Sequence, residues 1–179
     1  MNVLSPGTRS LLFGIHSIPF HCYYVMEAWQ IMGWSLTWKD RLAIIVHDFG
    51  YFGLKHLGKE GSRAHVMAGA LIMYGLVKYP IRDMVCHSSA IAHGFNRPMS
   101  RMGIADKLSM YLEPTWLYAL RAWLTVEQNY YYDVGEERIP GEDGTFKGLM
   151  RFKERAGRLA ARKAFADYAW RNQLYGKKA

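Results

Sequence analysis

Apolar side chains recur at helical spacing along most of this chain, and no stretch shows the strict alternation of a half-buried strand. Prolines, glycines and polar caps divide the pattern into successive elements. It predicts helices over residues 19–32, 37–47, 62–76, 80–91, 100–112 and 114–124. The predicted fold class is therefore all-α.

The boundaries of these elements follow from residues with known cap and turn preferences. Pro19 suits the first turn of a helix, and Gly33 suits its end. Thr37 with Asp40 three residues later predicts a capping box for the second helix. Glycines recur through residues 49–61, which predicts a loop before the third helix.

The C-terminal part differs in charge from the rest. Residues 133–147 are polar and contain glycine and proline, which predicts a surface loop, and a basic helix is expected over about 149–175. Residues 149–179 hold nine Lys or Arg and two Asp or Glu, a net charge of +7 out of +8 for the whole chain. The positive field therefore belongs to this tail.

Length and composition narrow the classes of protein. A chain of 179 residues, half of them apolar and 15% aromatic, is long enough for one domain with a real core, so we expect a single domain over residues 1–179. No apolar run approaches the roughly 18 residues of a membrane span, and residues 1–10 do not resemble a signal peptide. Cys22 and Cys86 give no disulfide framework. We expect a cytoplasmic protein without membrane contact.

A pair of adjacent polar residues marks the end of the second predicted helix. The apolar run 43–46 leads directly into His47 and Asp48. Adjacent helical side chains point about 100° apart, so these two can converge only near a helix end. Burying such a pair is costly unless something binds it, and a metal ion is the simplest partner.

The other predicted helices supply further candidate ligands, namely His21, His65, His87 and Asp106. A lone histidine on an apolar face is more often a core residue, but the adjacent His47–Asp48 pair makes coincidence less plausible. Four histidines and two carboxylates exceed the needs of one tetrahedral ion. They suit two ions about 3.5–4 Å apart with a bridging carboxylate. Mixed nitrogen and oxygen ligands are compatible with Fe, Mn, Co, Zn or Ni.

The order His, His-Asp, His, His, Asp on successive helices resembles the HD-domain superfamily of metal-dependent phosphohydrolases, over about residues 15–125. His47-Asp48 followed by Gly50 resembles its central motif, and residues 105–108, Ala-Asp-Lys-Leu, resemble its last one. Residues 65–70, His-Val-Met-Ala-Gly-Ala, resemble the extra histidine segment of the dinuclear branch. That branch includes nucleotide polyphosphatases, cyclic-dinucleotide phosphodiesterases and mixed-valent di-iron oxygenases.

The resemblance implies an HD-type helical bundle with two metal ions that share one carboxylate. The first ion is implied to be held by His21, His47, Asp48 and Asp106. The second is implied to be held by Asp48, His65 and His87. His16 is the alternative to His21, which we prefer because Val25 and Ala28 follow it at helical spacing.

The chemistry of such a site indicates further residues. A water between two metal ions ionises near neutral pH, and attack on phosphorus also needs cations that neutralise phosphoryl oxygens. Lys107 directly follows Asp106, and Arg97 and Arg101 lead into the same helix, so these three are predicted to bind substrate. Asp48 and Lys107 are the predicted catalytic residues.

The sequence therefore predicts a metal-dependent phosphohydrolase that cleaves a nucleotide or similar small phosphate ester with a metal-bridging hydroxide. One alternative is a mixed-valent di-iron oxygenase on the same ligands. Another is a regulatory or binding protein that acts through its basic C-terminal helix. Nucleic-acid contact by that helix and assembly into homo-oligomers also stay open.

Overall fold

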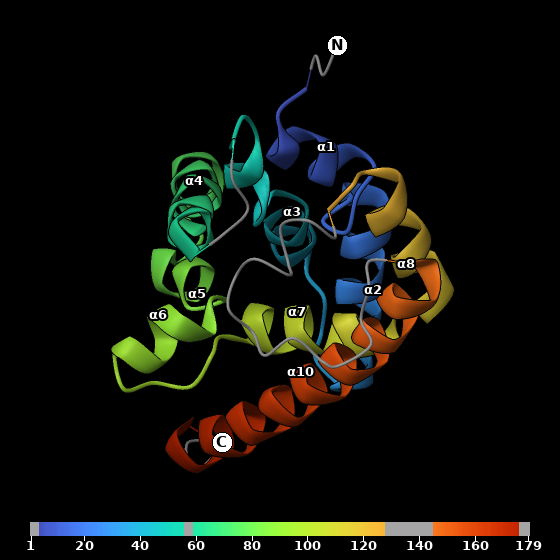
Figure 1. Ribbon diagram of the computed structural model, residues 1–179. Coiled ribbons are helices and arrows are strands. Elements are labelled where there is room, and N and C mark those ends of the chain that lie inside the picture. The colour runs from blue at the N-terminus through green and yellow to red at the C-terminus, as the bar shows by residue number, and fades with distance from the viewer. Residues whose placement is uncertain (1–3, 56–58, 128–144, 176–179) are drawn as a thin grey trace.

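The computed structural model describes residues 4–55, 59–127 and 145–175, and these residues contain helices and no strands (Figure 1). The all-α prediction is confirmed. The helices are α1 Pro6–Leu12, α2 Ile18–Ile31, α3 Trp38–Val46, the 3₁₀ turn η1 Phe49–Tyr51, α4 Lys59–Val77, α5 Ile81–Val85, α6 Ser89–Gly94, α7 Arg101–Leu112, α8 Thr115–Leu124 and α10 Phe146–Tyr175. None of the described helices is long and apolar enough to cross a membrane.

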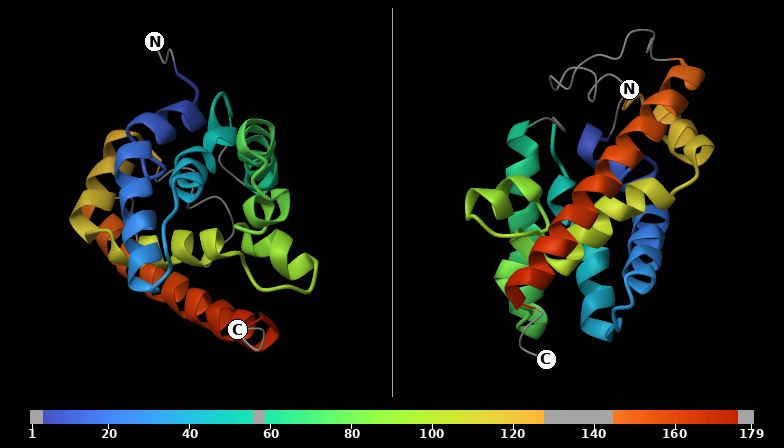
Figure 2. Two further views of the ribbon diagram at one scale, coloured as in Figure 1. Left: turned by 180° about the vertical axis from the view of Figure 1, so that it is seen from behind. Right: turned by 90° about the horizontal axis from the view of Figure 1, so that it is seen from below.

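Helix α7 is the central connection of the bundle. It packs against α2 and against α10, which also contacts α8 and runs along one side of the molecule (Figures 1 and 2). On the other side, α4 packs against α3, η1 and α5. The largest buried cluster joins α2, α3, α4 and α7 through residues such as Val25, Ile44, Met73 and Ile104. The candidate ligands project from the helices that surround this core.

Several predicted boundaries are confirmed by the backbone. Helix α2 ends just before Gly33, whose φ of 71° lies in the left-handed region that favours glycine. Helix α3 begins with the predicted capping box: the Asp40 N–H donates to the Thr37 hydroxyl, and the Thr37 N–H donates to the Asp40 carboxylate. The end of α2, which carries His21, and the start of α3, which leads into His47, were thus encoded locally.

Other boundaries were predicted wrongly. Helix α1 was not expected; Ser5 caps it and Pro6 opens it, but it buries small and polar residues and so lacks an apolar period. The expected loop over 49–61 instead contains η1, and α4 begins at Lys59. Most of the predicted loop 133–147 lies outside the described residues, while α10 starts at Phe146, inside its expected end.

The helix predicted over 80–91 is broken into α5 and α6. The Met84 carbonyl accepts the backbone N–H of His87, three residues later, and also the Nδ1–H of the His87 ring at 2.6 Å. The Cys86 carbonyl accepts from the Ser100 N–H at the start of α7. These contacts replace the continuing helical hydrogen bonds, so His87 lies in the break rather than on a helix face.

Candidate metal centre

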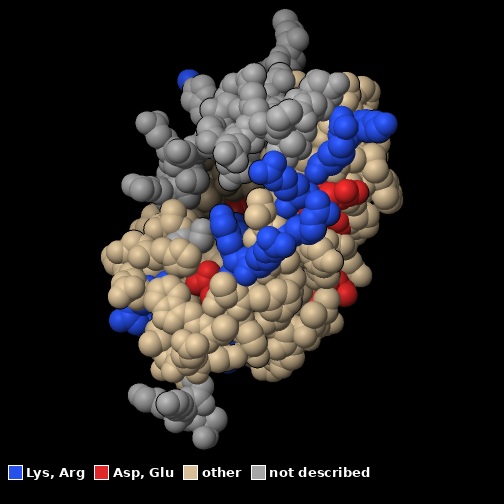
Figure 3. All heavy atoms as spheres, turned by 60° about the horizontal axis from the view of Figure 1, so that its bottom comes forward, with Lys and Arg blue, Asp and Glu red and all other residues tan. Residues whose placement is uncertain are grey.

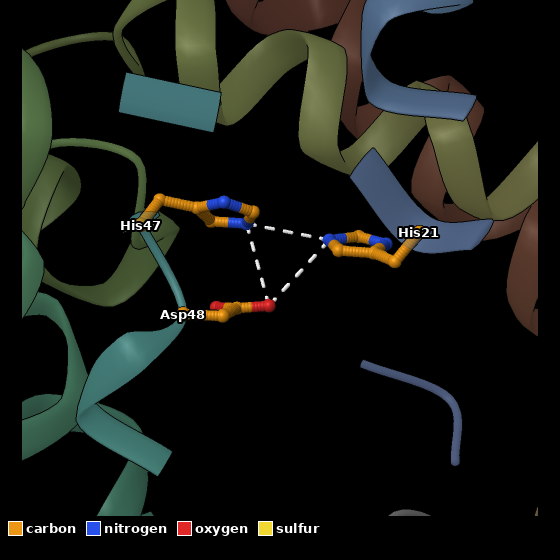
Figure 4. A group of neighbouring side chains, drawn as sticks. All are labelled: His21, His47 and Asp48. Atoms are coloured by element: carbon orange, nitrogen blue, oxygen red, sulfur yellow. Dashed lines mark hydrogen bonds and ion pairs between the residues drawn. The ribbon is translucent and has the colours of Figure 1, made fainter. Parts of the chain in front are cut away.

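His47 and Asp48 lie where the chain changes from an α-helix to a 3₁₀ turn. Helix α3 ends at Val46, and Asp48 has φ −95° and ψ 4° just before η1. This change of backbone lets the two neighbouring side chains meet, with 3.3 Å between His47 Nε2 and Asp48 Oδ2 (Figure 4). The predicted convergence at a helix end is what the structure contains.

The first group of ligand atoms is completed by α2 and α7. His21, in the first turn of α2, places Nε2 3.3 Å from His47 Nε2 and 3.5 Å from Asp48 Oδ2 (Figure 4). Asp106, on α7, places Oδ1 3.1 Å from His21 Nε2 and 3.8 Å from His47 Nε2. Four side chains from three helices and a turn therefore converge.

The second group uses the other oxygen of Asp48. Asp48 Oδ1 lies 3.7 Å from His65 Nε2 on α4. Ligand atoms of Asp48, His65 and His87 all lie within 4.8 Å of one another, and all three residues are buried. One carboxylate thus faces two groups, which is the arrangement of a bridging ligand.

The six residues fit metal ions in two respects: the spacing of their ligand atoms, and the presence of buried atoms without hydrogen-bond partners. Ligand atoms about 2.0–2.2 Å from a shared cation lie roughly 3.0–3.5 Å from one another, close to the 3.1–3.8 Å separations in the first group. Among the described residues, Asp48 Oδ2 and His87 Nε2 are buried without a hydrogen-bond partner. Such orphaned atoms are costly, and a bound cation would satisfy both.

The backbone fixes the ring tautomers of two histidines. His47 Nδ1 donates to the Ile44 carbonyl at 2.6 Å, and His87 Nδ1 donates to the Met84 carbonyl at the same distance. A carbonyl can only accept, so the Nδ1 atoms carry the protons and the Nε2 lone pairs face the cluster. Metal-binding histidines are oriented in this way by their outer hydrogen bonds.

Charge within the cluster shifts several pKa values. Burial alone would lower the pKa of His47, but Asp48 and Asp106 outweigh it and raise that pKa to about 9. Burial, reinforced by the charge on His47, lowers the pKa of His87 to about 3. Burial would raise the pKa of Asp48, yet the histidines, His47 foremost, hold it below its usual range. In the absence of a cation, a proton on His47 takes its place.

Two helix glycines let neighbouring backbones approach the ligands closely. A Cβ atom at Gly69 of α4 would lie 2.9 Å from the His47 carbonyl oxygen. A Cβ atom at Gly103 of α7 would lie 2.6 Å from the His87 carbonyl oxygen. Neither was predicted as a supporting residue, and the only sequence signal was a glycine inside a helical pattern, where it is unfavourable.

Tyr51 and His16 lie beside the cluster. The absence of a Cβ at Gly50 brings η1 against α4, and the Tyr51 ring stacks on His65 with 4.2 Å between ring centroids. His16, the alternative first ligand, has Nδ1 2.8 Å from the Ser10 hydroxyl and is not part of either ligand group. The structure therefore brings His21, rather than His16, to the shared point.

The predicted substrate-binding residues lie in different places. Lys107 Nζ is 2.9 Å from Asp106 Oδ2, and its side chain is 34% exposed. Arg97 donates to the Tyr175 hydroxyl at 3.1 Å, and the Arg101 guanidinium lies 5.7 Å from the Trp34 ring centroid. No described contact joins either arginine to the six ligands, so only Lys107 is brought to the cluster.

Of the two remaining histidines, His93 does not join the site. His93 Nε2 lies 3.1 Å from Asp167 Oδ1 of α10, whose carboxylate also accepts from the Met99 N–H. His56 lies outside the described residues. His93 and Asp167 thus form a histidine–carboxylate pair in which the carboxylate is satisfied within the protein, unlike Asp48 Oδ2 of the cluster.

Comparisons with protein-family models, with curated proteins and with solved structures gave no match. The resemblance to the HD-domain superfamily therefore depends on the motifs quoted above. The geometry shows independently that these His and Asp residues could hold metal ions.

Proposed function

We propose that this protein is a dinuclear metal-dependent phosphohydrolase that acts on a nucleotide or similar small phosphate ester. One observation carries the proposal: Asp48 Oδ2 faces His21 and His47, Asp48 Oδ1 faces His65, and ligand atoms of Asp48, His65 and His87 lie within 4.8 Å of one another. A site for a single ion would not need His65 and His87 beside the same carboxylate. Asp48 Oδ2 and His87 Nε2, two buried acceptors in this cluster, have no hydrogen-bond partner among the described residues, and bound cations would satisfy both.

The ligands and Lys107 have distinct tasks in this proposal. Two bound cations would supply an activated water and neutralise charge on the phosphoryl group. The ligand side chains hold the cations, and the backbone-bonded rings of His47 and His87 keep their lone pairs in place. Lys107 orients Asp106 and adds a positive charge at the partly exposed rim of the cluster.

The charge on α10 supports an anionic substrate. Arg151, Arg155, Arg158 and Arg162 follow one another at intervals of one helical turn. Lys and Arg side chains form a band across the face of the molecule that contains α10 (Figure 3). A positive surface raises the local concentration of phosphorylated molecules and speeds their encounter with the protein.

The decisive experiment is metal analysis of freshly purified protein, followed by hydrolysis assays. The protein is loaded with Mn, Co, Fe or Mg and assayed with p-nitrophenyl phosphate, bis-p-nitrophenyl phosphate and a panel of nucleotides. We expect two ions per chain and release of phosphate or nitrophenol. Asp48→Asn should lose bound metal and activity. Asp167→Asn is its matched control, because Asp167 is a buried aspartate beside a histidine outside the cluster.

The same measurements separate the alternatives. Iron-loaded protein that consumes O₂ and hydrolyses no phosphate would identify the oxygenase. Protein that binds no metal and turns over nothing, but still binds a partner through α10, would identify the regulatory protein. Loss of metal in Asp167→Asn as well as in Asp48→Asn would mean that metal content only reports folding.

A further inference from the structure

A hydrogen-bonded chain of side chains leads from the buried interior to the edge of the candidate ligand cluster. Ser10 of α1 donates its hydroxyl to Glu127 Oε2 at 3.1 Å, and the same oxygen atom of Ser10 lies 2.8 Å from His16 Nδ1. Ser10 and Glu127 are 0% and 1% exposed. Ser10 and His16 therefore form one continuous relay with Glu127, which lies 117 positions beyond Ser10.

The direction of the protons along this relay is determined by its end. The Glu127 carboxylate accepts from Ser10 and from the Ile15 N–H at 3.3 Å. The Thr125 hydroxyl lies 2.7 Å from both Glu127 Oε1 and the Arg121 carbonyl, which share its single proton. Since Ser10 has a single hydroxyl proton and gives it to Glu127, its oxygen accepts the Nδ1–H of His16. The Nε2 atom of His16 then carries the lone pair.

The backbone is shaped to hold Glu127 in this position. A Cβ atom at Gly14 would lie 1.6 Å from Glu127 Oε1, so only glycine leaves room for the carboxylate. Val126 has φ 59°, in the left-handed region that β-branched residues rarely adopt. Strain of this kind persists where the surrounding structure requires it, and it is common at functional sites.

The other end of the relay reaches both halves of the cluster. The His16 ring lies 4.3 Å from the Tyr51 ring, which in turn stacks on His65 of the second ligand group. It lies 6.1 Å, edge to face, from the ring of His21 in the first ligand group. His16 thus borders the position between the two groups, while its Nδ1 atom is occupied by Ser10.

We propose that His16 is a further catalytic residue, whose Nε2 lone pair accepts a hydrogen bond from the attacking water and orients it. Ser10 and Glu127 are positioning residues that fix the direction of this lone pair. The inference rests on the proposed hydrolase function and adds to it a fixed acceptor that is not a metal ligand.

Two substitutions at His16 separate this role from a merely structural one. His16→Asn keeps a donor near the place of Nδ1, opposite Ser10, and removes the acceptor at Nε2. His16→Gln keeps an acceptor near the place of Nε2. We expect kcat to fall about tenfold or more in His16→Asn, with much smaller loss in His16→Gln and two ions per chain in both. Equal kcat in both variants, or loss of a metal ion from either, would overturn the proposal.

The tautomer is measured without any assay of activity. Long-range ¹H–¹⁵N correlation spectra of the metal-free and Zn-loaded protein identify which ring nitrogen of His16 carries the proton. We expect Nδ1–H in the wild type and a mixture of tautomers in Ser10→Ala; a proton on Nε2 in the wild type would refute the relay. If the wild type hydrolyses no phosphate but shows the expected tautomer, the proposed function fails while the relay geometry holds.

Discussion

Two groups of buried charged residues in this protein differ in how they use their polar atoms. In the first, the cluster around Asp48, the atoms that face one another are nearly all electron-pair donors. In the second, which we call the Arg121 network, positive groups alternate with acceptors: Arg121 donates to the Glu113 carboxylate and the Gly14 carbonyl, and Lys153 donates to the Met110 and Glu113 carbonyls.

The contrast shows why burial of charge alone does not indicate a site. The Arg121 network gives each charged group a partner of opposite charge or a carbonyl within the protein, although the Arg121 Nε atom itself has no hydrogen-bond partner among the described residues. Buried ions are usually retained in this way for structural reasons. The Asp48 cluster turns lone pairs toward lone pairs, so it needs a bound cation or, in its absence, a proton on His47. Complementarity, rather than the number of ionisable side chains, separates the structural region from the candidate site.

The largest effect is expected from Asp48→Ala. Because this carboxylate faces both ligand groups, its removal should reduce bound metal toward zero and abolish hydrolysis. Elemental analysis and the nitrophenol assay measure both quantities. Retention of two ions per chain by this variant would remove the dinuclear model.

Substitution in the Arg121 network should lower stability and leave metal binding intact. Arg121→Met leaves Glu113 buried without its partner and should lower the free energy of unfolding by about 3–5 kcal/mol. Folded protein should still bind two ions. Urea titration checks the stability, and the double variant Arg121→Met/Glu113→Met should recover much of the loss; a double variant as unstable as the single one would contradict this.

Metal removal should lower the stability of every variant in which the Asp48 cluster is intact, whether or not the Arg121 network is. At a metal concentration one hundred times Kd, binding adds about 2.7 kcal/mol to stability, so a chelator should lower Tm by about 5–10 °C. Differential scanning calorimetry should show this shift in the wild type and in Arg121→Met, and no shift in Asp48→Ala. An unchanged wild-type Tm would indicate that the cluster does not bind metal in the folded state.

The two lysines attached to these regions make a matched pair. Lys107→Met should lower kcat/KM by at least about tenfold, because a charge-assisted hydrogen bond is worth roughly 1.5–3 kcal/mol. Lys153→Met should leave kcat/KM unchanged and lower stability by about 1–3 kcal/mol, since the Met110 and Glu113 carbonyls lose their donor. Steady-state kinetics and metal analysis on both variants test this. A loss of kcat/KM in Lys153→Met, or an unchanged kcat/KM in Lys107→Met, would contradict it.

The smallest effects concern two glycines. Gly103→Ala should cost about 1–3 kcal/mol and lower occupancy of the His65–His87 side, because the added Cβ presses on the His87 backbone. Gly75→Ala in α4 meets nothing within 4 Å and should raise stability by roughly 0.5–1 kcal/mol. Thermal unfolding and metal analysis compare the two variants. Equal Tm and metal content would show that the close contact between Gly103 and the His87 backbone is unimportant.

Local signals predicted much of the fold and the pairing of the central residues. The proline, glycine and capping residues around α2 and α3 act over a few positions, so the elements carrying His21 and His47 could be placed in advance. Helix α1 has no apolar period that would reveal it, because Thr8 and Ser10 are among its buried residues.

Other features depend on contacts between distant segments. The break at His87 is accompanied by the bond between Cys86 and Ser100, which a helical pattern over 80–91 cannot show. The relay joins Ser10 to Glu127 across 117 positions, and neither residue stands out in the sequence. The two arginines were placed near Asp106 by chain proximity alone, whereas their aromatic partners, Tyr175 and Trp34, come from other elements.

The separation of the ligands along the chain has a consequence for the order of folding. His21 precedes His47 by 26 residues, and Asp106 follows Asp48 by 58. Closing such loops costs entropy before any ligand atoms meet, so the complete cluster forms only when α2, α3 and α7 have docked. Contacts made after the transition state slow unfolding without speeding folding. Bound metal is therefore expected to slow unfolding, and so to lengthen the lifetime of the native state. It is not expected to act as a nucleus around which the helices assemble.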